Sequence, residues 1–164
     1  MSPKVHSKRR ENGVNAIETA IAAFFLIVIV AISVDLTILT MGFTILDTAT
    51  RDAARGAASQ QTLAKAISAA QSQLAIHKTD GVFIRQPTLT STSTPNFIYQ
   101  DFGGAAPPNP NQSPYVTVTC NTDIHLPVNA PFFGNDLKNL TANGYFTIAR
   151  RYTFPIVRAK YYGG

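Results

Sequence analysis

One stretch decides the fold. Residues 14–58 read VNAIETAIAAFFLIVIVAISVDLTILTMGFTILDTATRDAARGAA. No proline interrupts the stretch, and from Ala20 to Val34 it holds no charge, so the pattern predicts one long helix. At 1.5 Å per residue this helix would be about 65 Å long, roughly twice the thickness of a bilayer's hydrocarbon core. We therefore expect its first part to be inserted in a membrane and its second part to lie outside.

The basic charge of the chain is concentrated in a leader, residues 1–13. The formal net charge is +5 over 164 residues, and the leader contributes +3 of it, from four basic residues and one acid. A nucleic-acid-binding surface needs Lys and Arg clustered over a folded face, so we expect no nucleic-acid partner. Basic residues beside an apolar run instead set membrane orientation, so Lys8, Arg9 and Arg10 are expected to hold the leader in the cytoplasm.

Three interpretations of this N-terminal region compete. A plain signal anchor would keep the leader and the helix uncut. A secretory signal could be cut after Ser33, because Ala31-Ile32-Ser33 follows an apolar core, and the chain would then begin at Val34. A prepilin-type leader would be cut after Gly13. Glu18 favours the third interpretation, since an acid at the leading edge of the apolar run is out of place in a secretory signal.

The residues around Gly13 carry a resemblance to a known family. The segment GVNAIE, residues 13–18, follows Lys-Arg-Arg and precedes an apolar helix. It resembles the prepilin peptidase site of type IV pilins and pseudopilins. With Asp35 in the later part of the helix and the tail RDAARGAA at residues 51–58, the chain is most similar to the TadE-like pseudopilins or minor pilins of tight-adherence (Tad, or Flp) pili and secretion systems.

The resemblance covers Arg9 to Ala58 well and residues 115–158 loosely. The chain departs from the family at two points: Val14 stands where type IV pilins commonly have Phe, and the apolar run lacks the proline of many TadE-like helices. The resemblance implies that a membrane aspartyl peptidase, the prepilin peptidase, cuts between Gly13 and Val14. It also implies a structural role in adhesion or secretion, with other pilins, membrane assembly proteins and the lipid bilayer as partners.

The resemblance further implies a single-pass protein of the bacterial inner membrane, with its N-terminus in the cytoplasm and its C-terminal domain outside. Cleavage would make Val14 the first residue and Glu18 the fifth. The new α-amine and the Glu18 carboxylate would then lie at i and i+4 on one helix face, where they can pair within a subunit or between subunits. The alternative is that the helix in the membrane begins at Thr19 and that Glu18 faces water.

Three further charged residues of the long helix are candidates for contacts between helices. Asp35 is either a functional acid within the apolar helix or the mark of the outer membrane interface, 21 residues after Val14. Arg51 and Arg55 lie in the tail of the helix. Their spacing predicts pairs with Asp47 at i−4 and Asp52 at i−3.

The remaining chain predicts an α+β protein: the long helix with a small antiparallel sheet packed on its outer part. Residues 59–78 carry an apolar stripe at helical spacing, and this second helix either continues the first or folds back after a break near Ser59. Residues 79–164 are expected to be rich in β-structure, with an exposed loop at 105–114 that contains four prolines. Strands are expected at 82–85, 96–99, 115–128 and 145–157, and a helical turn at 137–140.

The sequence contains no arrangement typical of an enzyme. Phosphate-binding loops, metal-ligand spacings and nucleophile motifs do not occur, so we expect no catalytic residues, no cofactor and no metal site. Cys120 is the single cysteine and is interpreted as a buried apolar residue of a strand. Asp123 and His125 share the polar face of that strand and are interpreted as surface residues. The alternative to a pilin-like protein is an uncleaved, signal-anchored or secreted binding module.

Overall fold

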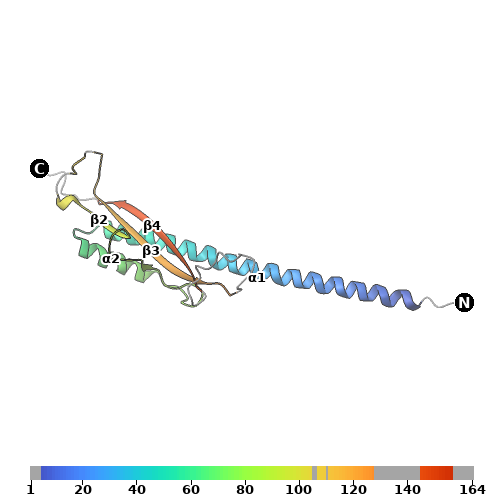
Figure 1. The fold of residues 1–164 in the computed structure, drawn as a ribbon. Coiled ribbons are helices and arrows are strands. Elements are labelled where there is room, and N and C mark those ends of the chain that lie inside the picture. Colours follow the sequence, from blue (N-terminus) through green and yellow to red (C-terminus); the bar gives the residue numbers. More distant parts are fainter. Residues whose placement is uncertain (1–4, 105–106, 110, 128–144, 157–164) are drawn as a thin grey trace.

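The computed structural model describes residues 5–104, 107–109, 111–127 and 145–156. One helix, α1, runs from Val5 to Ala58 without interruption and carries the rest of the molecule on its C-terminal part (Figure 1). Its 54 residues correspond to a length of about 80 Å. The fold is therefore α+β, as the sequence predicts: one long apolar N-terminal helix and a small antiparallel sheet.

The helix α1 starts earlier than the sequence analysis predicts and ends where it predicts. The expected start was Val14, but the backbone is helical from Val5, because the leader is rich in good helix formers and Gly13 alone lowers helix stability there by only about 1 kcal/mol. At the C-terminal end, the Ser59 amide bonds to the Arg55 carbonyl at 3.2 Å. The Ser59 hydroxyl donates to the Gly56 carbonyl at 2.8 Å. These two bonds give hydrogen-bond donors to carbonyl groups of the last helical turn, which have no partner within the helix.

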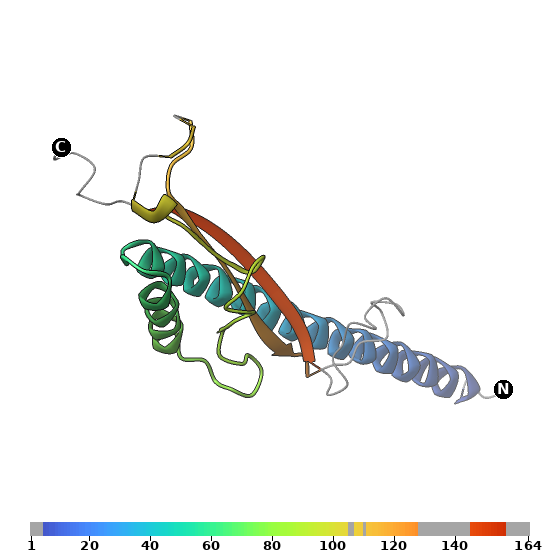
Figure 2. The ribbon, with the colours of Figure 1, turned by 60° about the vertical axis from the view of Figure 1, so that its left-hand side comes forward.

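A second helix, α2, covers Leu63–Ile76 and folds back along the end of α1 (Figure 2). The sequence left open whether this helix would continue the first, and the structure shows a break instead. Thr62 caps the new helix, with extended backbone and a side chain that accepts from the Lys65 amide at 3.4 Å. Gly56 lies against α2, since a Cβ built on it would be 2.8 Å from the Cγ of Gln73 and 3.7 Å from the Ala69 carbonyl. Small residues fill the core of both helices; those that are fully buried include Ala53, Ala54, Ala57, Ala66 and Ala70.

The sheet is built around one central strand, β3, Tyr115–His125. Strand β4, Tyr145–Pro155, pairs with it antiparallel along the full eleven residues. On the other side of β3 lie two short antiparallel strands, β1 at Thr88–Leu89 and β2 at Phe97–Gln100. A 3-10 turn, Phe102–Gly104, follows β2. The antiparallel pair that the sequence predicts is therefore present and packs on α1.

Strand β3 supplies the core mainly from one face, and on its other face only Thr117 is also buried. The side chains buried on the core face are Val116, Val118, Cys120, Thr122 and Ile124. These residues face the buried side of α1, whose members recur at helical spacing and include Gly42, Leu46, Ala49 and Ala53. Burial of each large aliphatic side chain contributes about 1.5–3 kcal/mol. The contact is close at Gly42, since a Cβ there would clash with the Cδ1 of Ile124.

Two details of the sheet differ from the sequence prediction. The expected strand at residues 82–85 is only a single bridge, Ile84 to Ile124, because a tight turn at Asp80 and Gly81 leaves too few residues to extend it. Conversely, β1 lies in the Thr-rich stretch 88–95, for which no strand was predicted; pairing with β3 compensates for its weak local signal. The helical turn predicted at 137–140 lies outside the described residues.

Candidate membrane and assembly helix

The N-terminal part of α1 protrudes from the folded domain and, over residues 20–32, is apolar on all sides. We call residues 15–34 the exposed segment. Its large apolar side chains are between 53% and 65% exposed at Ile17, Ile21, Phe24, Phe25, Leu26, Ile27, Ile29 and Val30. A helix that is hydrophobic all round is stable only when something covers it. Within the described part of the chain, α1 is the one helix that is long and apolar enough to cross a membrane.

The exposed segment ends at Asp35, where the buried face of α1 begins. The Asp35 side chain is only 2% exposed, and it lies about two helical turns before Gly42 and three before Leu46 on that buried face. The sequence allows two interpretations of this acid, as a functional group in the helix or as the mark of the outer membrane interface. Asp35 does lie at a boundary, because apolar side chains before it are exposed and the domain packs on the helix after it.

Hydroxyl groups along this part of α1 are satisfied within the helix. Ser33, Thr37, Thr40 and Thr44 each donate to the carbonyl four residues earlier, at 2.8–2.9 Å. A hydroxyl bonded in this way leaves no polar hydrogen without an acceptor. These residues can therefore lie against lipid or another helix without the cost of an unsatisfied donor.

The predicted processing residues lie in the helical backbone at the start of α1. Gly13 and Val14 are both helical, as are the leader positions Lys8, Arg9 and Arg10, whose side chains lie outside the described part of the structure. Glu18 follows on the exposed segment, with an exposed side chain. Within the described ranges its carboxylate has neither a hydrogen bond nor an ion pair. The helix places Glu18 one turn after Val14 on the same face, as the i,i+4 argument requires.

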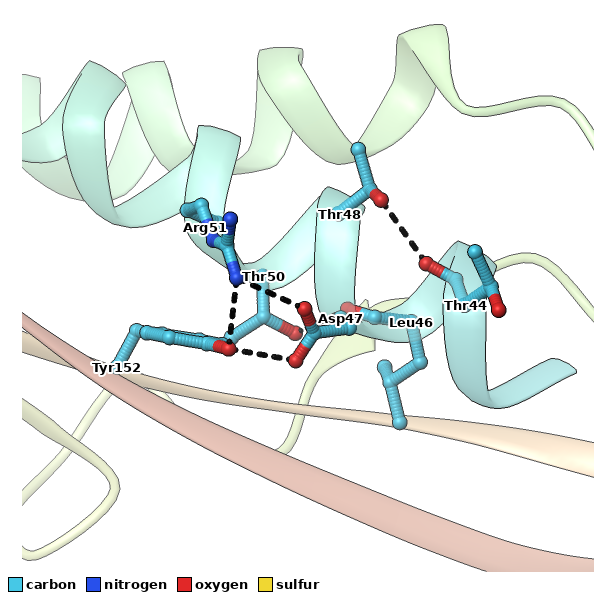
Figure 3. Close-up of polar contacts among 7 residues, drawn as sticks. All are labelled: Thr44, Leu46, Asp47, Thr48, Thr50, Arg51 and Tyr152. Atoms are coloured by element: carbon cyan, nitrogen blue, oxygen red, sulfur yellow. Dashed lines mark hydrogen bonds and ion pairs between the residues drawn. The ribbon is translucent and has the colours of Figure 1, made fainter. Parts of the chain in front are cut away.

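The two arginines of the α1 tail contact strand β4. The Arg51 guanidinium pairs with Asp47 at 3.0 Å, as predicted from their spacing, and also donates to the Tyr152 hydroxyl at 3.2 Å (Figure 3). The hydrogen bond that Arg51 donates to Tyr152, and after it the charges of Tyr152 and Asp47, raise the pKa of Arg51. Arg55 lies over the ring of Phe154, 5.6 Å from its centroid.

One predicted ion pair is wrong. Asp52 was expected to pair with Arg55 at i+3, but its Oδ2 lies 3.1 Å from Nε2 of His77, the C-cap residue of α2. The reason is the fold-back of α2, which brings His77 beside Asp52 while the aromatic ring of Phe154 attracts Arg55.

Comparisons of the chain with protein-family models, with curated proteins and with solved structures gave no match. Among the described residues, no group of three or more His, Cys, Asp or Glu side chains lies together as a metal site would require. Cys120 is fully buried, as predicted, and burial raises the pKa of its thiol to about 11.

Sequence reasoning missed one element of this region. Tyr152 bridges to both Asp47 and Arg51, yet it lies about a hundred positions later in the chain. Tyr152 belongs to the alternating apolar positions of the last predicted strand, which indicated that its side chain would face the helix. Nothing in the linear pattern indicated which helix residue its hydroxyl would meet.

Proposed function

We propose that the protein is a structural pilin-like subunit, a pseudopilin or minor pilin of a tight-adherence type pilus or secretion apparatus. The observation that carries the proposal is the division of α1: its first part is apolar on every side and exposed, and its second part is buried under the sheet. A subunit of this shape can store its exposed segment in a bilayer and later pack that segment against the helices of other subunits.

The dimensions of α1 support membrane storage. Residues 14–34 would span about 31 Å as a helix, which matches the roughly 30 Å hydrocarbon core of a bilayer. Asp35 and the folded domain follow directly after this length. With the basic leader held in the cytoplasm, the outer domain lies on the opposite side of the membrane. The protein then crosses the inner membrane once.

Processing at Gly13 accounts for the position of Glu18. The cut would release an α-amine on Val14 at the edge of the bilayer, where an unpaired charge costs a few kcal/mol. Glu18 lies one helical turn away and offers the opposite charge, to its own amine or to that of a neighbouring subunit. In a packed array of helices, this pairing would define the axial register between subunits.

Gly13 suits the cut for a second reason. The backbone is helical on both sides of the Gly13–Val14 bond in the full-length chain. A peptidase that reads an extended bond must first unwind this turn. Glycine reduces the cost of unwinding, because it is about 1 kcal/mol less favourable than alanine within a helix and prefers to leave it.

The N-terminus of the mature chain tests the proposal. We expect the protein isolated from membranes of peptidase-competent cells to begin at Val14, by N-terminal sequencing and intact mass. In cells without the peptidase it should retain residues 1–13, and Gly13→Leu should block the cut in competent cells. An uncut wild-type chain in competent cells would instead support a signal-anchored module, and a chain that begins at Val34 would support a secreted one.

A further inference from the structure

A tight turn at residues 80–84 holds two apolar side chains out of the domain. The Oδ1 atom of Asp80 accepts the amides of Val82, Phe83 and Ile84 at 3.2, 3.2 and 2.9 Å. Gly81 completes the turn with a φ of +70°, a conformation that glycine adopts at little cost. Ile84 points inward and is 3% exposed, whereas Val82 is 60% exposed and Phe83 is 37% exposed.

The turn lies at the end of the domain that faces the exposed segment of α1, which we call the near end (Figure 1). The chain from Arg85 back to Gly81 runs beside the last residues of β3. The Arg85 amide bonds to the Asp123 carbonyl at 2.9 Å, and the His125 amide bonds to the Phe83 carbonyl at 2.7 Å. The tip of the turn therefore extends past the C-terminal residue of β3, toward the exposed segment.

The packing of the turn on α1 shows how far the turn lies from Asp35 along the helix. Ile84 lies beside Gly42, since its Cδ1 is 3.9 Å from the position of a Cβ built on that glycine. Gly42 follows Asp35 by seven residues, or about 10 Å along the helix. Val82 lies in the bend two residues before Ile84, so it lies at most about 6–7 Å closer to the exposed segment. The tip of the turn therefore lies within about 10 Å of the level of Asp35.

The surroundings of the tip fit a lipid surface. The Arg85 side chain is 48% exposed, and its guanidinium lies 3.9 Å from the centroid of the Tyr145 ring, an arrangement of cation and aromatic ring suited to a membrane–water interface. The two nearby carboxylates already have partners. Asp80 accepts hydrogen bonds from three backbone amides, and Asp123 pairs with Arg85 at 3.3 Å and accepts a hydrogen bond from Thr147 at 2.6 Å. Their repulsion of an anionic headgroup is therefore weakened.

We propose that the 80–84 turn docks on the headgroup layer of the bilayer that α1 crosses, with Val82 and Phe83 inserted at the boundary with the acyl chains. This inference rests on the proposed function, because it requires residues 14–34 to span the hydrocarbon core. The headgroup layer on each side is then about 5–8 Å thick, and the tip, which lies within about 10 Å of the level of Asp35, is close enough to reach it. The contact would hold the outer domain at a fixed tilt on the membrane until assembly begins.

Depth-dependent fluorescence quenching tests the proposal in the full-length chain. Single cysteines are introduced in a Cys120→Ala background, labelled with an environment-sensitive dye, and reconstituted into vesicles of phosphatidylcholine and phosphatidylglycerol that carry nitroxide-labelled lipid. Val82→Cys reports on the turn and Ala23→Cys on the exposed segment of α1. Ser113→Cys is the matched control, because it is exposed and precedes β3 at the opposite end of the domain.

We expect the dyes at positions 23 and 82 to lose most of their fluorescence to the lipid quencher and to resist iodide, and the dye at 113 to behave in the opposite way. Quenching by lipid at position 23 but not at 82 would overturn the docking and leave the proposed function intact. A dye at 82 that resists both quenchers would show that protein covers the turn, and would also overturn it. Absence of lipid quenching at position 23 would contradict the membrane insertion on which both proposals depend.

Discussion

The hydroxyl of Tyr152 donates a 2.6 Å hydrogen bond to the carboxylate of Asp47, which lies 105 positions earlier in the chain. The same hydroxyl accepts from Arg51 at 3.2 Å, and Arg51 pairs with Asp47 at 3.0 Å (Figure 3). Three side chains therefore satisfy one another across the junction of α1 and β4. This polar contact specifies where the strand lies along the helix, which apolar packing alone would specify less strictly.

Substitution of Tyr152 by Phe removes the hydroxyl and keeps the ring. We expect the free energy of unfolding of the outer domain to fall by about 1 kcal/mol, the usual contribution of one hydrogen bond at a partly exposed site. Denaturant unfolding in detergent, followed by circular dichroism, measures it. A double-mutant cycle with Asp47→Ala isolates the pair, and a coupling energy near zero would contradict the role assigned to this bond.

Substitution of Gly42 by Ala tests the close approach of α1 and β3. The new methyl group would clash with Cδ1 of the fully buried Ile124. Overpacking of this kind costs about 1–3 kcal/mol, and the gain in helix propensity offsets about 1 kcal/mol of it. We therefore expect a net loss of about 1 kcal/mol in the free energy of unfolding, measured in the same assay.

Two variants control this experiment. In an Ile124→Val background the Cδ1 atom is absent and only the Cγ1 contact at 3.1 Å remains, so Gly42→Ala should cost much less. Gly56→Ala makes its one tight contact with the Cγ of Gln73, at 2.8 Å, a flexible side chain at a half-buried site that can move aside. It should therefore stabilise the protein slightly. If Gly42→Ala were equally destabilising with Val at position 124, the clash would not be its cause.

The buried thiol of Cys120 should make stability depend on alkaline pH. Burial raises the pKa of this thiol from its ordinary value of 9.0 to about 11 in the folded protein. The folded state holds the proton more tightly, so this contribution to stability is fully present below pH 9 and is lost as the pH rises toward 11. The loss is on the order of 2 kcal/mol, given 1.36 kcal/mol per unit.

The control for this prediction is Cys120→Ala, which removes the titrating group. The difference in free energy of unfolding between the parent and this variant, measured from pH 8 to pH 11, isolates the thiol from the tyrosines that titrate over the same range. A difference that stays constant with pH would contradict the prediction. The same burial predicts that thiol reagents modify the folded protein only after it unfolds.

Glu18 should be needed for assembly and not for processing. Glu18→Gln keeps the size of the side chain and removes the charge that we assign to the Val14 amine. We expect normal cleavage and membrane insertion, with loss of most assembled pilus or secretion activity, measured on sheared surface material and in a secretion assay. Glu11→Gln is the matched control, because this acid lies in the leader that cleavage removes. Full assembly with Gln at position 18 would refute the pairing role.

Local patterns predicted the main elements well. The long helix was predicted to end at Ala58 and does so, and the alternating stretch from Tyr115 became β3 with the expected face buried. Both patterns are properties of neighbouring residues, because the periods of 3.6 and 2 place side chains on one face whatever lies opposite. Arg150 broke the apolar alternation of β4, and the structure supplies the reason: its guanidinium lies 5.2 Å from the centroid of the Phe43 ring.

By itself the sequence thus determined the helix with an apolar first part, the central strands, and the candidate positions Gly13 and Glu18. Only the tertiary structure decided that α2 folds back at Thr62, that Asp52 meets His77 instead of Arg55, and that Tyr152 closes on Asp47. Each of these contacts joins side chains far apart in the chain, and their energies depend on which surfaces meet. Periodicity identifies the face that a residue occupies, whereas packing selects its partner on the facing element.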